Sequence, residues 1–304
     1  MLVGHSKCPS IMSKQPVQNK HQEHFEDLLL EGDLSVLDFF NGDYEVSLKI
    51  DGSPAVVFGT NPANGQWFVS TKSAFNKVKI KLCHSHEEID THFQGKVADI
   101  LHACFDYLPR TDSIVQCDFL GFGDTDTLQP NTISYQFSEV ITQKIVVAPH
   151  TVWITDGELK DAYVSGSAPF FVDTDDVKFV QPCVDTIPIS LPEIDTNGVR
   201  FLSVKDAEVA KKNINALIRQ GKDLTWWELS EILGCKKLAH LYLLMIELKE
   251  DLMDCMIVTD SPRAYIGDRQ IVGEGFVCKN DKMIFKLVNR LEFAYANFNL
   301  QKSW

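Results

Sequence analysis

A lysine at position 49 stands where its amine could act as a nucleophile. It lies near the end of a strand-like run, residues 44–50, directly before Asp51-Gly52-Ser53-Pro54, a sequence typical of a turn. An ammonium group on a strand that enters a buried sheet is costly, and burial lowers the pKa of a lysine, which makes its amine more nucleophilic. The alternative is a surface lysine on an edge strand beside a common Asp-Gly turn.

A second set of charged residues lies near the other end of the chain. Residues 266–288 contain two strand-like runs joined by the polar turn Asn280-Asp281. Glu274 and Lys279 lie in the first run and Lys286 lies in the second, each among apolar neighbours. Each run therefore carries a charge inside an apolar context, as the run that contains Lys49 does.

Taken in order, these motifs resemble those of the covalent nucleotidyltransferase superfamily, which contains ATP-dependent DNA and RNA ligases and capping enzymes. The first motif of that superfamily, KxDG, is matched by Lys49-Ile50-Asp51-Gly52. The fourth, EGxVxK-like, is matched by residues 274–279, and the fifth, a lysine-bearing strand, is matched at Lys286. The ordered series is more specific than KxDG alone.

The resemblance implies a mechanism that starts from ATP and a divalent metal, Mg²⁺ or Mn²⁺. Lys49 would attack the α-phosphorus and form a lysyl-AMP phosphoramidate, its amine kept neutral by burial and by the cation of Lys286. Glu274 would hold the metal, and Lys279 and Lys286 would meet phosphate oxygens. Asp51 and Gly52 would lie beside the nucleotide, with Asp51 shaping the turn rather than binding metal.

Three further residues are assigned by the resemblance. Lys72 would meet the nucleotide ribose or phosphate, with a solvated lysine as the alternative. Asp118, in the place of the third-motif acid, would contact the metal or the ribose, and Asp124 and Asp126 are competing candidates. Trp153 would stack on the adenine ring, and the alternative for it is a tryptophan of the hydrophobic core.

The chain departs from the superfamily pattern at one position. Many members carry a second lysine two residues before the fifth-motif lysine, and here that position is Ile284. We therefore expect Lys286 to act alone, or with partial help from Lys282. The departure bears on ligase activity more than on nucleotide binding.

Composition limits the classes of function. The 304 residues carry a formal net charge of −13, so a polynucleotide would have to bind at a local basic patch, of which Lys72, Lys77, Lys79 and Lys81 form the densest. A solvated surface is the alternative for that cluster. The eight cysteines contain no CxxC pair, which argues against a zinc site or a disulfide framework. We expect no membrane segment, a monomer, and a cytoplasmic location.

Hydrophobic periodicity divides the chain into three parts. Residues 1–20 are predicted to form a flexible lead-in, and residues 202–220 and 224–258 are predicted to be helical. We predict an inserted helical subdomain at 189–259 and an adenylation domain made of residues 21–188 and 260–304. The predicted class is α+β: antiparallel sheets flanked by helices, as in the ATP-grasp-like adenylation domain of ligases.

The resulting prediction is an ATP-dependent polynucleotide ligase of the RNA-ligase type, acting on RNA ends in preference to DNA ends. One alternative is adenylyl transfer to a protein or small molecule. Another is a non-catalytic module that binds nucleotide or nucleic acid with the same fold. Three short phrases, at residues 23–28, 71–77 and 129–135, resemble ligase-like proteins of tailed bacteriophages, which would place the protein in a host cytoplasm.

Overall fold

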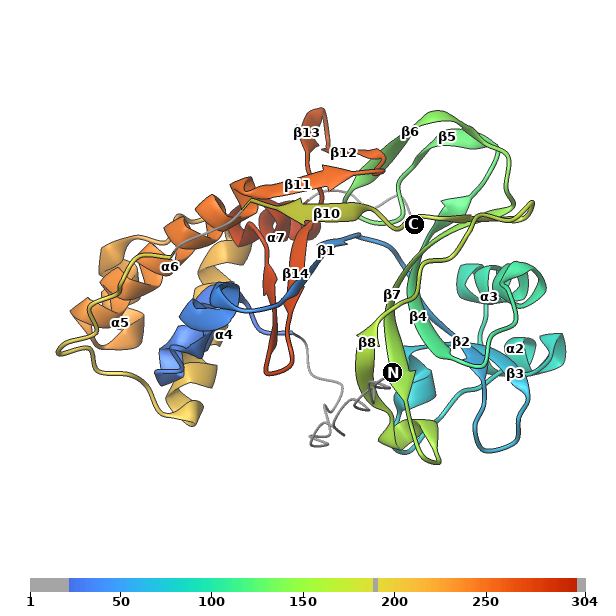
Figure 1. Ribbon diagram of the computed structural model, residues 1–304, viewed down its shortest axis with the longest axis horizontal. Helices are drawn as coiled ribbons and strands as arrows, with labels where there is room; N and C mark the ends of the chain where they lie inside the picture. The colour runs from blue at the N-terminus through green and yellow to red at the C-terminus, as the bar shows by residue number, and fades with distance from the viewer. Residues whose placement is uncertain (1–21, 188–190, 300–304) are drawn as a thin grey trace, which may run out of the picture.

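Antiparallel sheets with helices packed around them form the fold, which confirms the predicted mixture of α and β structure. The structure is a computed structural model that describes residues 22–187 and 191–299, so the predicted lead-in at 1–20 lies outside the described ranges. The longer helices gather at two ends of the molecule (Figure 1). One end holds α4 (Val204–Arg219), α5 (Trp226–Leu233) and α6 (Lys236–Asp254), and the other holds α2 (His86–His92) and α3 (Lys96–Tyr107).

A three-stranded antiparallel sheet joins the two distant motifs. Its order is β1 (Glu45–Lys49), β14 (Gly275–Lys279) and β15 (Ile284–Leu287). The turn between β14 and β15 is set by the Asn280 side chain, which accepts hydrogen bonds from the backbone N–H groups of Lys282 and Met283, both at 2.9 Å. Two strands that are more than 220 residues apart in the sequence thereby become neighbours.

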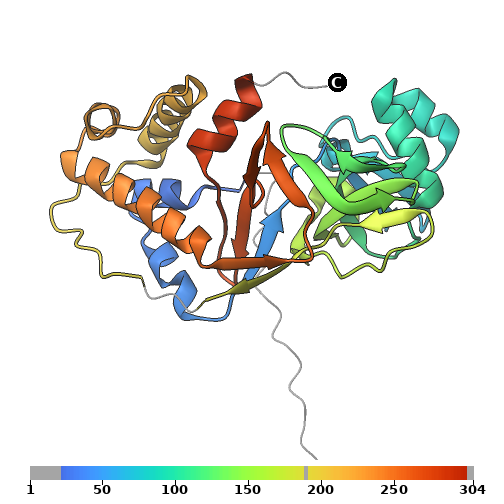
Figure 2. The same ribbon diagram turned by 90° about the horizontal axis from the view of Figure 1, so that it is seen from above.

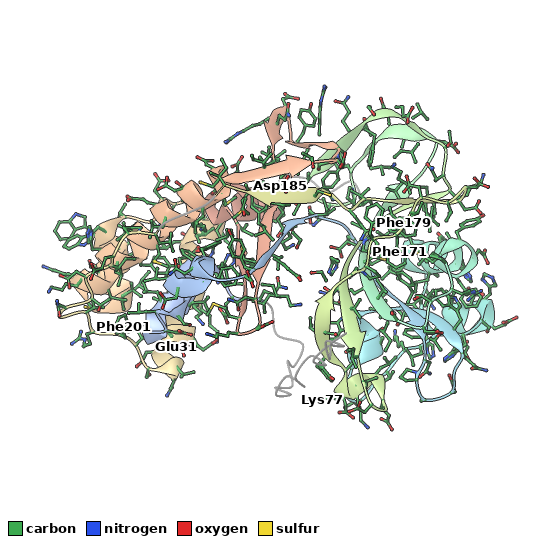
Figure 3. All side chains as sticks on the ribbon, in the orientation of Figure 1. Glu31, Lys77, Phe171, Phe179, Asp185 and Phe201 are labelled. Atoms are coloured by element: carbon green, nitrogen blue, oxygen red, sulfur yellow. The ribbon has the colours of Figure 1, made fainter. Side chains whose placement is uncertain are left out.

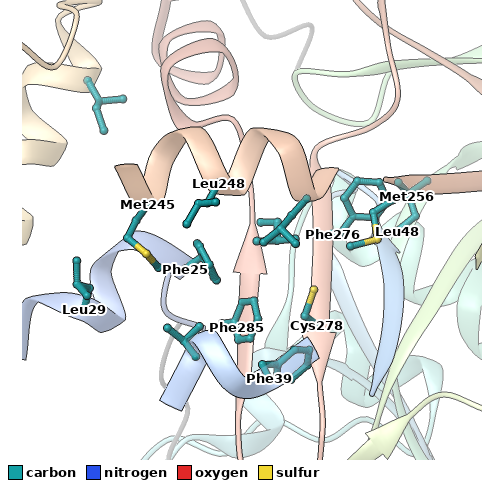
Figure 4. Close-up of a cluster of buried hydrophobic side chains, with 14 of the residues drawn as sticks. Phe25, Leu29, Phe39, Leu48, Met245, Leu248, Met256, Phe276, Cys278 and Phe285 are labelled. Atoms are coloured by element: carbon teal, nitrogen blue, oxygen red, sulfur yellow. The ribbon is translucent and has the colours of Figure 1, made fainter. Parts of the chain in front are cut away.

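The two faces of this sheet differ in character, because side chains alternate along a strand. Leu48, Phe276 and Phe285 point into a hydrophobic core, and Figure 4 shows them packed against residues of α6 and of the N-terminal helix. Lys49 and Lys286 lie at positions of the opposite parity and belong to the other face. Because the face that carries Leu48, Phe276 and Phe285 is buried, Lys49 and Lys286 both lie on the opposite face of the sheet.

The helices of the region 189–259 share this core with the sheet. Apolar residues of α4, α5 and α6 form one continuous cluster with α1 (Phe25–Leu28), with the short 3-10 helices η1 (Leu29–Glu31) and η2 (Ser35–Asn41), and with the three-stranded sheet. The predicted single helical run at 224–258 was wrong in two places. Gly234 ends α5 in the left-handed conformation (φ 61°), and the run finishes as strand β11 (Met256–Thr259).

A larger sheet occupies the other half of the molecule. Its path runs β3 (Trp67–Thr71), β2 (Ala55–Thr60), β4 (Ile114–Phe122), β7 (Ile145–Ile154) and β8 (Tyr163–Ser167), and β9 (Val177–Phe179) pairs with β7 in parallel. Helices α2 and α3 pack their apolar residues on one face. The apolar run at 145–154, which by its sequence alone predicts a buried pair of strands, is one strand in the structure, with a register shift against β4, so that prediction was wrong.

Smaller elements complete the fold. Strand β10 (Cys183–Thr186) pairs with β11, and a four-stranded sheet runs β13 (Arg269–Ile271), β12 (Arg263–Ile266), β6 (Ser134–Ile141) and β5 (Thr125–Leu128). Two short 3-10 helices, η3 (Lys72–Phe75) and η4 (Leu159–Asp161), and the helix α7 (Arg290–Asn299) fill the remaining positions. Seen from above, the helical end, the three-stranded sheet and the larger sheet follow one another along the long axis (Figure 2).

Charged side chains are buried where the helices meet the sheet. Lys249 of α6 donates to Glu26 at 2.8 Å, and Arg290 donates to Glu26 and Asp27 at 3.2 and 3.0 Å. Tyr242 donates to Asp27 at 2.7 Å. Burial opposes the charge of Glu26, but the two cations lower its pKa to about 2. The ion pairs connect helices α1, α6 and α7.

His24, beside this network, is expected to make stability depend on pH. Burial, then the cation of Arg290, lower its pKa from 6.5 to about 2, so between these values only the unfolded chain binds the proton. Stability should therefore fall as pH drops below 6.5, by about 2 kcal/mol at pH 5, since one pKa unit is worth about 1.36 kcal/mol. Urea unfolding at pH 7.5 and 5.0 measures this loss.

The control for His24 is the exposed His240 of α6. His24→Gln should flatten the dependence between pH 7.5 and 5.0, whereas His240→Gln should leave it as in the wild type. An equal pH dependence in His24→Gln and the wild type would contradict the assignment.

Candidate active site

Lys49 and Glu274 meet at the end of the three-stranded sheet. Lys49 is the last residue of β1 and pairs with Gly275, the first residue of β14, so Glu274 stands beside it. The Lys49 ammonium donates a hydrogen bond to Glu274 Oε2. The side chains are 30% and 11% exposed, respectively, so the pair is partly shielded from water. The structure thus brings together two residues that the sequence separates by 225 positions.

Gly275 is required for this approach. Its φ is +143°, and a β-carbon added there would lie 2.1 Å from the carbonyl oxygen of Leu287 on β15. No side chain fits in that space, and the backbone conformation favours glycine. Gly275 therefore allows β14 to lie close to β15, while Glu274, the residue before it, reaches Lys49.

We expected the Lys49 amine to be neutral, and the structure instead favours its protonated form. Burial alone would lower the pKa of the amine, but the attraction of Glu274, with smaller contributions from Asp118 and Asp51, raises it above its ordinary value. The prediction of an amine kept neutral by burial and by Lys286 is therefore wrong for this state of the protein. Lys286 itself has a lowered pKa, first because of burial and then because of the Lys49 charge.

Asp51 holds the turn that follows Lys49. Its carboxylate accepts hydrogen bonds from the Asn131 side chain at 2.9 Å and from the backbone N–H groups of Thr132 and Ile133 at 3.0 and 3.3 Å. Its own backbone N–H donates to the Tyr135 hydroxyl at 2.6 Å. These bonds fasten the turn to the segment before β6, the structural role that we predicted for Asp51.

Gly52 places the turn against β4. A β-carbon at position 52 would lie 2.7 Å from Cβ of Asp118 and 2.9 Å from the carbonyl oxygen of Phe119. The backbone of Ser53 also donates to that oxygen at 2.9 Å. The Asp-Gly pair therefore lets the larger sheet come close to the end of β1.

Replacing Asp51 should destabilise the protein. Asp51→Ala leaves two buried backbone N–H groups and the Asn131 amide without an acceptor, which should cost about 2–4 kcal/mol. Urea unfolding measures the loss. The control is Asp126→Ala, because Asp126 is exposed and, among the described residues, accepts a hydrogen bond only from the adjacent Thr127 side chain. Equal stabilities of the two variants would show that the Asp51 hydrogen bonds contribute little.

Asp118 lies in the middle of β4, on the face of the larger sheet that contacts Gly52. Its side chain is 19% exposed, and His150 Nε2 lies 3.8 Å from its Oδ1. The Gln116 side chain lies 3.4 Å from the same histidine nitrogen. We did not predict His150, and no local motif could have identified it, because its position depends on the shifted register between β4 and β7.

Trp153 is part of a small hydrophobic cluster. It is 8% exposed, its indole N–H donates to Gln116 at 3.2 Å, and its ring lies 4.2 Å from that of Phe75. Phe75 covers the ring. Trp153 therefore lies in the hydrophobic core, which was the alternative interpretation of this residue. Adenine stacking stays a prediction.

The remaining predicted lysines lie farther out. Lys72 begins η3 directly after β3 and is exposed. Lys77 is also exposed, and Figure 3 shows it on the half of the molecule away from Glu31 and Phe201. Lys279 is half-buried, and a β-carbon on Gly166 of β8 would lie 3.4 Å from its Nζ. Lys279 therefore extends from the small sheet to the larger one.

Two carboxylates near Lys49 are the candidate metal ligands. Within residues 22–187 and 191–299, no group of three or more His, Cys, Asp or Glu side chains is arranged to hold an ion. Glu274 and Asp118 both act on the charge of Lys49. Mg²⁺ commonly takes one or two carboxylates and completes its shell with water and phosphate oxygens, so each of these two side chains is of a ligand type that Mg²⁺ prefers. No helix in the described ranges has the length and apolarity to cross a membrane.

The comparisons with known proteins identify a family but no activity. Neither a curated protein nor a solved structure matches the chain. Residues 19–191 and 230–302 match a family of unknown function, DUF6267. The unmatched residues between them include all of α4 and the start of α5. Since the match covers most of the sequence, the chain belongs to the DUF6267 family.

Proposed function

We propose that the protein is an ATP-dependent nucleotidyltransferase that carries AMP on Lys49 and passes it to a polynucleotide 5′-phosphate, on RNA in preference to DNA. The observation that carries the proposal is the contact between Lys49 and Glu274 at the ends of adjacent strands. It is supported by the resemblance of the surrounding sequence to the KxDG and EGxVxK motifs. The fold proposed with it is the adenylation domain of ligases.

Each charged residue has a part in this chemistry. Glu274 orients the Lys49 ammonium and is the base in contact with it, so it is placed to take the proton that the amine must lose. Lys286 and Lys279 supply cations for phosphate oxygens. A Mg²⁺ or Mn²⁺ ion held by Glu274 and Asp118 would neutralise phosphate charge. Asp51 and Gly52 keep the turn after Lys49 in place.

The acceptor is tested by discharging the labelled enzyme. Protein carrying labelled AMP is freed of ATP and mixed with 5′-phosphorylated RNA, with the same RNA ending in a 5′-hydroxyl, and with nicked duplex DNA. We expect label to move to the 5′-phosphorylated RNA, more slowly to DNA, and not to the 5′-hydroxyl strand. Label that stays on the protein with every strand would refute a polynucleotide acceptor.

A nucleotide-binding module without chemistry is the second candidate. Its support is the raised pKa of Lys49, which keeps the amine protonated, together with Ile284 in the place of a second lysine. This candidate predicts calorimetric binding of ATP with no covalent label under any divalent metal. A covalent label would exclude it.

A further inference from the structure

A pocket of about 380 Å³ lies beside the candidate active site. It is half open to solvent and is lined by residues 22–24 and 27, by one face of α4 and by Lys286 of β15. Residue 286 pairs in parallel with His24, so the N-terminal segment runs along the edge of the three-stranded sheet. The pocket is therefore built where the helical end of the molecule meets that sheet.

Lys286 belongs to both the pocket and the site. It borders the cavity, and Lys49 and Glu274 are among the charges that act on it. Lys49 does not border the pocket. If the α-phosphate of a triphosphate lies at Lys49 and the chain of phosphates passes Lys286, the β- and γ-phosphates would therefore lie in this pocket.

The charges that line the pocket leave cations available. Glu23 and Glu208 both pair with Lys211, at 3.3 and 3.9 Å, and Asp27 accepts from Arg290 at 3.0 Å. Lys212 and Lys286 have no carboxylate within 4.0 Å among the described residues. Lys211 is shared by three carboxylates, since Glu31 also lies 3.8 Å from it, so the acids on the wall are neutralised only in part. Lys212 and Lys286 have no such partner in the described ranges and are left to bind an anion.

The size of the pocket limits what it can hold. The volume of 380 Å³ is about a dozen times the roughly 30 Å³ that a water molecule takes in the liquid. This admits a diphosphate with part of its hydration. The Asn215 amide, which also borders the cavity, adds a polar group to the wall.

We propose that this pocket receives the pyrophosphate that leaves when ATP reacts with Lys49. The Lys49 ammonium first gives one proton to Glu274, which frees the lone pair of the nitrogen. The nitrogen then forms a bond to the α-phosphorus and releases a second proton to water, while the bond from that phosphorus to the bridging oxygen breaks and its electron pair leaves with pyrophosphate. Lys286 lies near the α-phosphate and Lys212 binds the departing group. The inference depends on the proposed function for the origin of the pyrophosphate, but its binding is measurable without any reaction.

The test is calorimetric binding of inorganic pyrophosphate to the full chain. Lys212→Glu should weaken binding about tenfold and Lys212→Gln by a few-fold, because a cation that contacts phosphate contributes roughly 1–2 kcal/mol. The control is Lys205→Glu, which makes the same charge change on exposed α4 surface away from the pocket. Unchanged melting temperatures establish that the variants are folded. A wild type that does not bind pyrophosphate, or equal binding by Lys212→Glu, overturns the proposal.

A second readout separates this inference from the proposed function. Pyrophosphate should discharge the adenylated wild type back to ATP, and Lys212→Glu should need about tenfold more pyrophosphate for the same rate. If adduct forms and this requirement is unchanged, the pocket assignment fails and the proposed function stands. If no adduct forms in any protein but Lys212→Glu still weakens pyrophosphate binding, the pocket assignment stands and the proposed function fails.

Discussion

Replacing Lys49 with alanine is expected to reduce covalent labelling by α-labelled ATP by roughly 10⁴-fold or more, which is the scale of effect when a catalytic nucleophile is removed. The residue is assigned this role because it is the amine in contact with Glu274. The measurement is the label retained by protein after denaturing electrophoresis, with Mg²⁺ or Mn²⁺ present.

Lys49→Arg is the matched control for that experiment. Alanine leaves the mostly buried Glu274 carboxylate without its partner, so lost labelling could reflect a disturbed sheet. Arginine keeps the positive charge and can still donate to Glu274, but it does not lose its proton at accessible pH and cannot attack phosphorus. We expect Lys49→Arg to fold, to bind ATP and to take up no label. Labelling of the arginine variant at the wild-type rate would remove Lys49 from the mechanism.

Replacing Arg290 with methionine should cause a large loss of stability, about 3–5 kcal/mol. Arg290 is 5% exposed and donates hydrogen bonds to Glu26, Asp27 and Tyr242, and at 2.6 Å to Asn215. Removing one partner of a buried ion pair leaves the other charge uncompensated, and here two carboxylates would be left with Lys249 as the remaining cation nearby. Urea unfolding at pH 7.5 measures the difference.

The control for Arg290 is another arginine of the same region. Arg269 is 73% exposed and pairs with Glu292 at 3.0 Å, so Arg269→Met should change stability by less than about 1 kcal/mol. Arg290→Lys should recover only part of the loss, because an ammonium group cannot reproduce the planar donor geometry of the guanidinium. Equal stability of Arg290→Met and Arg269→Met would mean that the buried network contributes little.

The elements that carry the lysine and the acid could be predicted from local sequence. Strand β1 alternates polar and apolar residues, whereas β14 and β15 are short apolar runs that carry one lysine each. Turn-forming residues bound these strands, so their positions follow from short-range preferences. The apolar stripe of Val97, Ile100, Leu101 and Phe105 predicts a helix over 97–108, and the structure has this helix at 96–107. These segments have one buried face, which is why their pattern is readable.

Other segments needed the tertiary structure. The strand at residues 145–154 is buried over its first half, so its apolar run contains no alternation that would distinguish one strand from two. The nearness of His150 to Asp118 depends on a register shift, and the pocket beside Lys286 depends on the packing of α4 against the N-terminal segment. The raised pKa of Lys49 also comes from a contact across strands. Local sequence contains none of these relations.

Intact-mass spectrometry of the wild-type protein after incubation with ATP and Mg²⁺, followed by peptide mapping, tests the central claim most directly. We predict a mass increase of one AMP moiety on the peptide that contains Lys49, which is lost in acid as expected for a phosphoramidate. An unmodified protein with either Mg²⁺ or Mn²⁺, or an AMP moiety on any other residue, would contradict the account.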